Sequence, residues 1–320
     1  MKKFIKNIFI LLIPIFIVTC CINYVYKKNS PNFGTMGNCK NDDAYIVDVP
    51  DGIELMCVGN SHGYYGFNFD KYKNDYVCFN FSLSSQSMSY NYRVMENYRD
   101  KIKDGAVIFI CISYTSFFGQ DETALDNFES KNKRYYHFLD RKYIKEYDLK
   151  TDIFVRYLPS LGVDSIKLID TLQGRVENRD YWNKQTSRDA ALKHGAARYK
   201  SQIEINVDSD GNRIMNETEI NSVYDLINLC REEGAVPILI TTPFLSEYTN
   251  PIIENDPEFF DDFYEIIEKI QNDTGVDYYD YGFDDRFSSN YKLFFNTDHL
   301  NRKGARKFVD ILMKEIVSVL

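Results

Sequence analysis

Two uninterrupted apolar runs, AVIFICI at 106–112 and VPILITTP at 236–243, constrain the fold of this chain most strongly. Both are rich in β-branched residues and lack the polar alternation of a strand with one solvated face, so we expect both to be central strands of a parallel sheet. Weaker strand patterns and amphipathic helix patterns alternate around them (strands 53–58, 76–79 and 276–282; helices 216–233, 257–272 and 301–320). The alternation predicts an α/β fold, a three-layer sandwich with a central parallel sheet and helices on both faces.

The N-terminus carries a second strong signal. No charged residue occurs in the 19 residues from Ile8 to Tyr26, and Lys2, Lys3 and Lys6 precede them. This length suits one crossing of a bilayer, and no small-residue cleavage site follows it. We therefore expect residues 1–28 to be a cytoplasmic tail and signal-anchor transmembrane helix, because positive charge favours the cytoplasmic side.

The rest of the chain is expected to lie outside the membrane. Residues 29–50 are polar and turn-rich, as in a stalk, and residues 51–320 form the α/β domain. The stretch from about 115 to 215 lacks a long apolar strand and is predicted to be a mostly helical insertion covering the active-site edge. We thus predict a single-pass cell-membrane protein with an extracytoplasmic C-terminal domain.

Charge and cysteine usage exclude some classes of function. Beyond residue 28 the chain has 33 basic against 47 acidic residues, a net charge of −14, so it would repel a nucleic-acid backbone. The sequence also shows no basic patch for anionic lipid. The seven cysteines show neither zinc-ligand spacing nor a disulfide framework, and we expect no metal and no cofactor.

Candidate catalytic residues lie near the two ends of the predicted domain. Ser61 follows the strand 53–58 in a turn of small residues, which places it at the carboxyl edge of the sheet. His299 lies in a loop just before the last helix, and a serine with a histidine base can attack an acyl carbon. Each also has a plainer interpretation, Ser61 as a turn serine and His299 as a structural residue at a helix start.

Three blocks of sequence together resemble the SGNH/GDSL-type hydrolases. The first is Gly59-Asn60-Ser61, at the end of a strand; the second is NFSLSSQS at 80–87; the third is NTDHLNRKG at 296–304. The histidine directly after the serine, His62, makes this block resemble the membrane-anchored branch of the family, which includes alginate O-acetylase-like and lipoteichoic acid D-alanylation proteins. The resemblance implies Ser61 as nucleophile and His299 as base, with Asn80 in the oxyanion block.

The sequence departs from the family at three positions. Ser85 stands where the family has its oxyanion glycine, and Ser113 stands where a supporting asparagine would follow the central strand. Asn296 replaces the aspartate that orients the base, and it lacks the charge that stabilises an imidazolium. Asp298 and His62 are secondary candidates, Asp298 being an unexpected replacement because it is adjacent to His299.

The resemblance implies a membrane-anchored serine-dependent O-acyltransferase or esterase. It would act on acyl esters of a cell-envelope glycan or polyol polymer, with the backbone N–H groups of Ser61 and Ser85 holding the oxyanion, and would work with a multi-spanning membrane acyltransferase. A second interpretation is a catalytically weak SGNH-fold subunit for binding or assembly in a polymer-modification complex. A third, a soluble lipase, is disfavoured by the anchor and the polar insertion.

Overall fold

The computed structural model describes residues 2–30, 46–163, 165–175 and 181–320. The chain forms two compact units, one from residues 1–47 and 129–179, the other from 48–128 and 180–320. The second unit holds the sheet and is called the α/β unit below. The first holds the N-terminal helix and is called the anchor unit.

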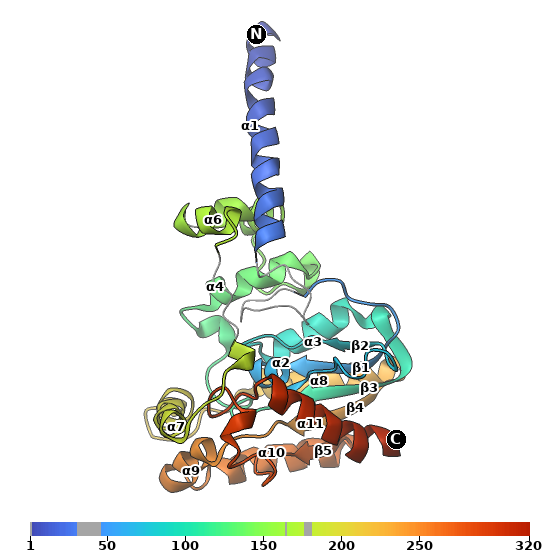
Figure 1. The fold of residues 1–320 in the computed structure, drawn as a ribbon, viewed down its shortest axis with the longest axis vertical. Helices are drawn as coiled ribbons and strands as arrows, with labels where there is room; N and C mark the ends of the chain where they lie inside the picture. The colour runs from blue at the N-terminus through green and yellow to red at the C-terminus, as the bar shows by residue number, and fades with distance from the viewer. Residues whose placement is uncertain (1, 31–45, 164, 176–180) are drawn as a thin grey trace. The chain divides into compact units, whose positions relative to one another are not determined.

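The α/β unit is built on a five-stranded sheet in the order β2-β1-β3-β4-β5, in which every neighbouring pair is parallel (Figure 1). The strands are β1 (Ile53–Gly59), β2 (Cys78–Asn80), β3 (Ile102–Cys111), β4 (Val236–Thr241) and β5 (Asp277–Asp280). The two apolar runs form β3 and β4, which lie next to each other at the centre of the sheet. Residues of both faces are buried, as shown by Cys57 and Val58 of β1. This confirms the predicted parallel α/β class.

Helices connect the strands, as the amphipathic patterns predict. Those of the α/β unit are α2 (Ser61–Gly66), α3 (Met88–Asn97), α7 (Arg188–Gln202), α8 (Glu217–Glu232), α9 (Ser246–Asn255), α10 (Phe259–Thr274) and α11 (Arg302–Glu315). Local signals set their ends: the Asn216 side chain accepts from the Glu219 N–H at the start of α8, and Gly275 ends α10 with a φ of 68°. The sequence analysis did not predict α9, whose interior contains Pro251.

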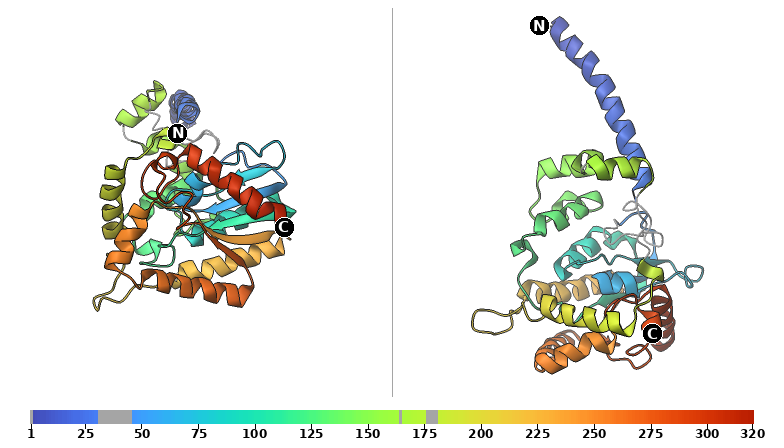
Figure 2. Two further views of the ribbon diagram at one scale, coloured as in Figure 1. Left: turned by 60° about the horizontal axis from the view of Figure 1, so that its bottom comes forward. Right: turned by 60° about the vertical axis from the view of Figure 1, so that its left-hand side comes forward.

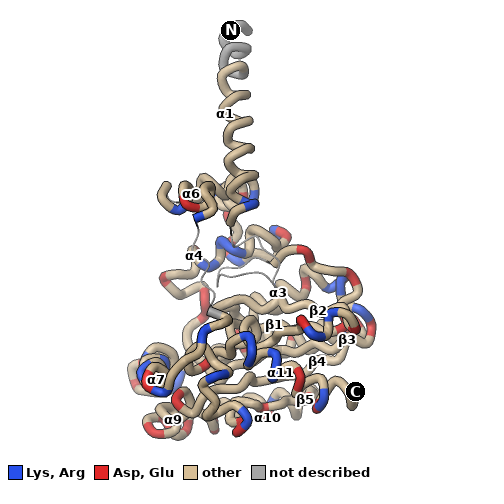
Figure 3. The backbone as a smooth tube through the Cα atoms, viewed as in Figure 1, with Lys and Arg blue, Asp and Glu red and all other residues tan. Residues whose placement is uncertain are grey.

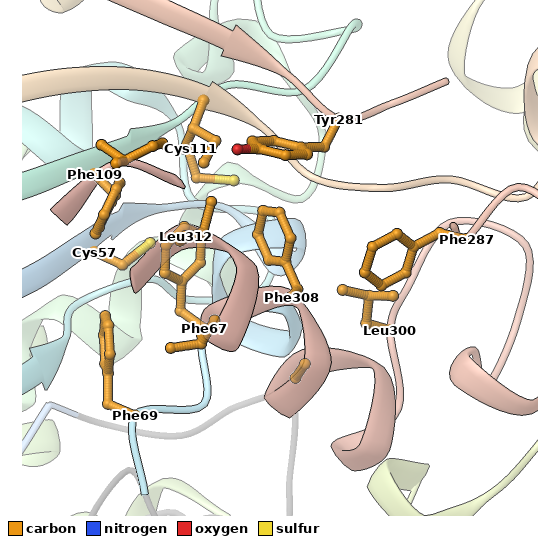
Figure 4. Close-up of a cluster of buried hydrophobic side chains, with 14 of the residues drawn as sticks. Cys57, Phe67, Phe69, Phe109, Cys111, Tyr281, Phe287, Leu300, Phe308 and Leu312 are labelled. Atoms are coloured by element: carbon orange, nitrogen blue, oxygen red, sulfur yellow. The ribbon is translucent and has the colours of Figure 1, made fainter. Parts of the chain in front are cut away.

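A buried apolar cluster joins the sheet to the last helix (Figure 4). Cys57 and Phe109 contribute from β1 and β3, while Phe308 and Leu312 come from α11. Leu300, in the loop before α11, belongs to the same cluster. This packing holds the start of α11 beside the ends of the central strands.

The anchor unit contains α1 (Lys2–Asn29) and the helical segments α4 (Phe128–Asn132), α5 (Leu149–Asp152), the π-helix η6 (Ile153–Tyr157), the 3₁₀ turn η7 (Pro159–Gly162) and α6 (Ser165–Leu172) (Figure 2). Within α1, Ile10–Asn29 is long and apolar enough to span a membrane. The structure divides the predicted insertion 115–215, because residues 129–179 join the anchor unit and the remainder joins the α/β unit. Most of the predicted stalk, 31–45, lies outside the described residues.

Candidate active site

Ser61 is held at the end of β1 by a turn that only small residues permit. Gly59 ends the strand, and a Cβ atom there would lie 2.7 Å from Cβ of Cys111 on the neighbouring strand β3. The Asn60 side chain caps α2 by accepting from the His62 N–H at 2.9 Å, so Ser61 is the first residue of that helix. Ser61 is partly exposed.

Hydrogen bonds in the loop before α11 fix the position of His299. Asn301 caps α11, accepting from the N–H groups of Lys303 and Gly304, both at 3.1 Å. Its amide nitrogen donates to the carbonyl groups of Lys184 and Lys292, at 3.0 Å each, which fixes the start of the helix from the other side. Asn301, in the block NTDHLNRKG, thus fixes the backbone on the C-terminal side of His299.

The structure brings Ser61 and His299 together across 238 residues of sequence. Nε2 of His299 lies 2.8 Å from Oγ of Ser61. This is the geometry in which a neutral imidazole accepts the hydroxyl proton.

The other nitrogen of His299 faces two oxygen acceptors. Nδ1 lies 3.1 Å from Oδ1 of Asn296 and 3.2 Å from Oδ1 of Asp298, with the Asn296 amide nitrogen at 3.0 Å. Oδ1 of Asn296 also accepts the backbone N–H of His299 at 2.8 Å, which fixes the orientation of the amide. The Asn296 oxygen as acceptor and the negative charge of Asp298 favour the proton on Nδ1, leaving Nε2 free to act as a base.

Asp298 lies at the centre of the polar cluster around His299. Its side chain is only 1% exposed, and it approaches Nε of Arg198 at 3.1 Å and Nε2 of His62 at 3.5 Å. His194 lies 3.7 Å from the same carboxylate and contacts the Thr297 hydroxyl. From the sequence, Asp298 is not expected to replace the aspartate of the resembled family, because it is adjacent to His299. The structure places its charge beside His299, although its Oδ1 lacks an aligned hydrogen-bond donor.

Burial and charge set the protonation states of this cluster. Burial lowers the pKa of His299 to about 4, against the opposing charge of Asp298. Burial alone would raise the pKa of Asp298, but His299, His62 and Arg198 together hold it well below its usual range. At neutral pH the cluster therefore contains a neutral His299 and an ionised Asp298.

Two of the predicted oxyanion residues have other partners. The Asn80 amide donates to the carbonyl groups of Gly63 and Phe67, at 3.0 and 3.2 Å, so both its protons hold α2 in place. The Ser113 hydroxyl accepts from the Asn60 amide at 2.6 Å, and the Ser113 N–H donates to Ser116. Both residues therefore support the turn around Ser61.

Ser85, the third predicted oxyanion residue, has a backbone conformation typical of glycine. Its φ is 53°, in the left-handed region that favours glycine, and its side chain is exposed. The backbone thus keeps the conformation of a glycine position although the residue is a serine.

Aromatic side chains surround His299. Its ring stacks on Phe295 at a centroid distance of 5.3 Å and meets the edge of Tyr65 at 5.2 Å. Tyr65 in turn contacts Trp182, a half-buried residue of the 3₁₀ turn η8 (Tyr181–Asn183), at 6.5 Å. Tyr135 and Tyr136 are buried in the anchor unit, so they pack there and offer no exposed sugar platform.

Among the described residues, one trio has the spacing of metal ligands. The ligand atoms of His62, Asp298 and His299 all lie within 4.8 Å of one another. However, Nε2 of His299 is already engaged by Ser61, and Arg198 brings positive charge to Asp298. This donor set fits a proton-transfer site better than a divalent cation.

Sequence reasoning missed the contribution of α7. His194 and Arg198 come from this helix, and the sequence patterns singled out neither residue. Their spacing of four residues puts both side chains on one helix face, which is the signal that was available. Trp182 and Thr297 were likewise not singled out.

Comparison with known proteins adds no relative. No protein-family model matches the chain, and no curated protein matches it.

Proposed function

We propose that this protein is a membrane-anchored SGNH-type O-acyltransferase or esterase, with a three-layer SGNH-like domain outside the cell membrane. Its substrates are acyl esters of a cell-envelope glycan or polyol polymer. The observation that carries the proposal is the 2.8 Å contact between Oγ of Ser61 and Nε2 of His299, backed by the buried Asp298 carboxylate.

The chemistry follows from this arrangement. His299 Nε2 takes the Ser61 proton as Oγ bonds to the acyl carbonyl carbon, and the imidazolium is stabilised by Asp298. The ester C–O bond then breaks as His299 returns the proton to the departing hydroxyl, which leaves an acyl group on Ser61. A polymer hydroxyl or water then gives its proton to His299 and attacks the same carbon. The bond between that carbon and Oγ breaks, and His299 returns the proton to Oγ of Ser61.

Backbone donors supply the oxyanion site in this proposal. The N–H of Ser61 lies in the first turn of α2, where helix geometry leaves it without an intrahelical acceptor. The left-handed φ of Ser85 suits the second donor, as in the resembled family. Such preorganised donors commonly contribute about 10²–10³ in rate.

The choice of substrate rests on the anchor and on the resemblance. A span at Ile10–Asn29 keeps the domain at the membrane surface, where a polymer hydroxyl and a multi-spanning acyltransferase partner are both within reach. The half-buried Trp182 near His299 offers an aromatic surface for a sugar or polyol.

A fluorophosphonate probe tests the activated serine. The full-length protein is purified in detergent, incubated with the probe and read by intact mass, beside Ser61→Ala and His299→Ala. We expect one adduct that requires both residues. Ser318→Ala, at an exposed serine of the C-terminal end, is the matched control and should label like the wild type.

Two outcomes of the labelling experiment would refute the proposal. An unlabelled wild-type protein, with a normal cooperative unfolding transition, would refute acyl-enzyme chemistry in this domain alone. An adduct that survives Ser61→Ala would refute the assignment of the nucleophile.

The hydrogen bonds of the predicted oxyanion residues favour a second function, without efficient catalysis. The Ser113 N–H and both Asn80 amide protons are already donated within the protein, so fewer donors remain than the family motif implies. A catalytically weak binding or assembly subunit of a polymer-modification complex would have such a site. Retained polymer binding by a protein that does not label would select this function.

A further inference from the structure

The anchor unit carries apolar side chains on its surface close to the end of α1. Leu161, Ile166 and Ile169 are 55%, 73% and 51% exposed, and Phe154 and Tyr157 are 40% and 59% exposed. They lie on η6, η7 and α6. Several large apolar side chains exposed within one short segment commonly mark an interaction site.

Hydrogen bonds fix the level of this surface along α1. Oδ1 of Asn23 accepts from the N–H and the hydroxyl of Ser160, at 2.9 and 2.7 Å, so η7 lies beside Asn23. The Asn29 amide donates to the Leu172 carbonyl at 3.1 Å, so the end of α6 lies beside the last residue of α1. Figure 1 shows α6 crossing near this end of α1.

This level coincides with the expected outer boundary of a membrane. The uncharged run of α1 ends at Tyr26, and Lys27 and Lys28 follow. With a rise of about 1.5 Å per residue, Asn23 is roughly 5 Å inside that boundary and Asn29 roughly 5 Å outside it. The region within about 5–10 Å of the boundary is where interfacial helices bury their apolar faces.

The charge of the two units is consistent with placing this surface at the membrane boundary. Residues 129–179 carry 11 Lys and Arg against 8 Asp and Glu, a net charge of +3, whereas the α/β unit has 21 against 37, a net charge of −16. Figure 3 shows basic residues at the end of α1 and on the segments next to it. The negative net charge of the ectodomain therefore comes from the α/β unit, and residues 129–179 would not be repelled by anionic lipid.

We propose that residues 149–172 form an interfacial platform that lies on the bilayer crossed by α1. Phe154, Tyr157, Leu161, Ile166 and Ile169 enter the boundary between headgroups and acyl chains, and nearby lysine and arginine side chains face the lipid phosphates. The occupant of this surface is lipid. The inference rests on the membrane anchoring proposed above and is independent of the acyl chemistry.

The single tryptophan of the chain makes a direct test possible. In a Trp182→Phe background, one new tryptophan is introduced by Leu161→Trp or Ile166→Trp on the platform. Phe16→Trp in α1 reports insertion of the anchor, and Ile253→Trp, at a 48% exposed position of α9, is the matched control. Each full-length variant is reconstituted in phosphatidylcholine–phosphatidylglycerol vesicles containing brominated phosphatidylcholine.

Loss of tryptophan fluorescence reports contact with the lipid. We expect quenching at positions 161 and 166, stronger with bromine near the glycerol end of the chain than near its methyl end, and little quenching at 253. Quenching at 16 without quenching at 161 and 166 would overturn the platform and leave the anchor standing, with a protein partner or second copy as the occupant. No quenching at 16 would overturn both the platform and the anchor. The acyl chemistry is tested separately, by labelling Ser61 in the wild-type protein, and its failure would leave the platform standing.

Discussion

Replacing Asp298 with asparagine tests the electrostatic argument for the active site. The substitution keeps the size of the side chain and removes a charge whose Oδ1 lies 3.2 Å from Nδ1 of His299. Two unit charges about 4 Å apart interact by about 4 kcal/mol at an effective dielectric constant of about 20. Arg198, 3.1 Å from the other oxygen, offsets part of this.

The remaining stabilisation of the imidazolium is about 2.7 kcal/mol, which corresponds to a factor of about 100 in rate. We therefore expect Asp298→Asn to label with the fluorophosphonate about 100-fold more slowly than the wild type. The assay is the second-order rate constant of labelling, read by intact mass over time. Asp310→Asn, which removes a surface carboxylate paired with Lys71 at 2.8 Å, is the matched control and should keep the wild-type rate.

The pH dependence adds an independent readout. Burial lowers the pKa of His299 to about 4, so labelling should be constant near neutral pH and fall as the pH drops through about 4. The Asp298 charge raises this pKa, so in Asp298→Asn the acid limb should move to lower pH. A rate within about threefold of the wild type, worth less than 1 kcal/mol, would refute the reasoning and leave Asn296 as the group that orients His299.

Three further predictions concern stability and the oxyanion turn. His299 is neutral in the folded protein but has a pKa of about 6.5 when unfolded, so the free energy of unfolding should fall by up to about 3 kcal/mol between pH 6.5 and pH 4. In denaturant titrations, His299→Gln should lose this contribution to the pH dependence; the same pH dependence in the variant and the wild type would contradict the prediction. Gly59→Ala places a Cβ against Cys111 and should lower the unfolding free energy by about 1–3 kcal/mol in urea; an unchanged midpoint would show that β1 and β3 can separate. Ser85→Gly relieves a left-handed φ and should raise the unfolding free energy by about 1 kcal/mol, whereas the control Ser84→Gly should not. The Ser85→Gly protein should label at the wild-type rate, and slower labelling would assign a role to the Ser85 side chain.

Local sequence signals were sufficient for the strands and most helices. The runs at 106–112 and 236–243 are apolar on both faces, and only a central position in a sheet buries both, so β3 and β4 followed from the pattern. The structure begins β3 at Ile102, before the apolar run, because parallel pairing with β1 starts there, at Ile53. The helix α9 escaped prediction because a proline inside a helix argues against it locally.

The candidate site was predictable only where a motif marks a turn or a cap. Ser61 and His299 stand in such motifs, at the end of a strand and before a helix, so both could be singled out. The roles of Asn80 and Ser113 could not be assigned, because a side chain amide or hydroxyl has several possible partners until the fold fixes one. Arg198 has no motif at all and reaches the site only through the packing of α7.

The sequence alone determined the parallel α/β class and the apolar N-terminal helix, and it singled out Ser61 and His299 as candidates. These depend on short-range patterns: a period of apolar residues, an uncharged run, a glycine at a crowded turn. The tertiary structure alone decided that Ser61 and His299 meet, that Asp298 supplies the charge Asn296 lacks, and that residues 129–179 pack with the N-terminal helix. Each of these depends on distances between segments far apart in the chain, and only the packed core sets such distances.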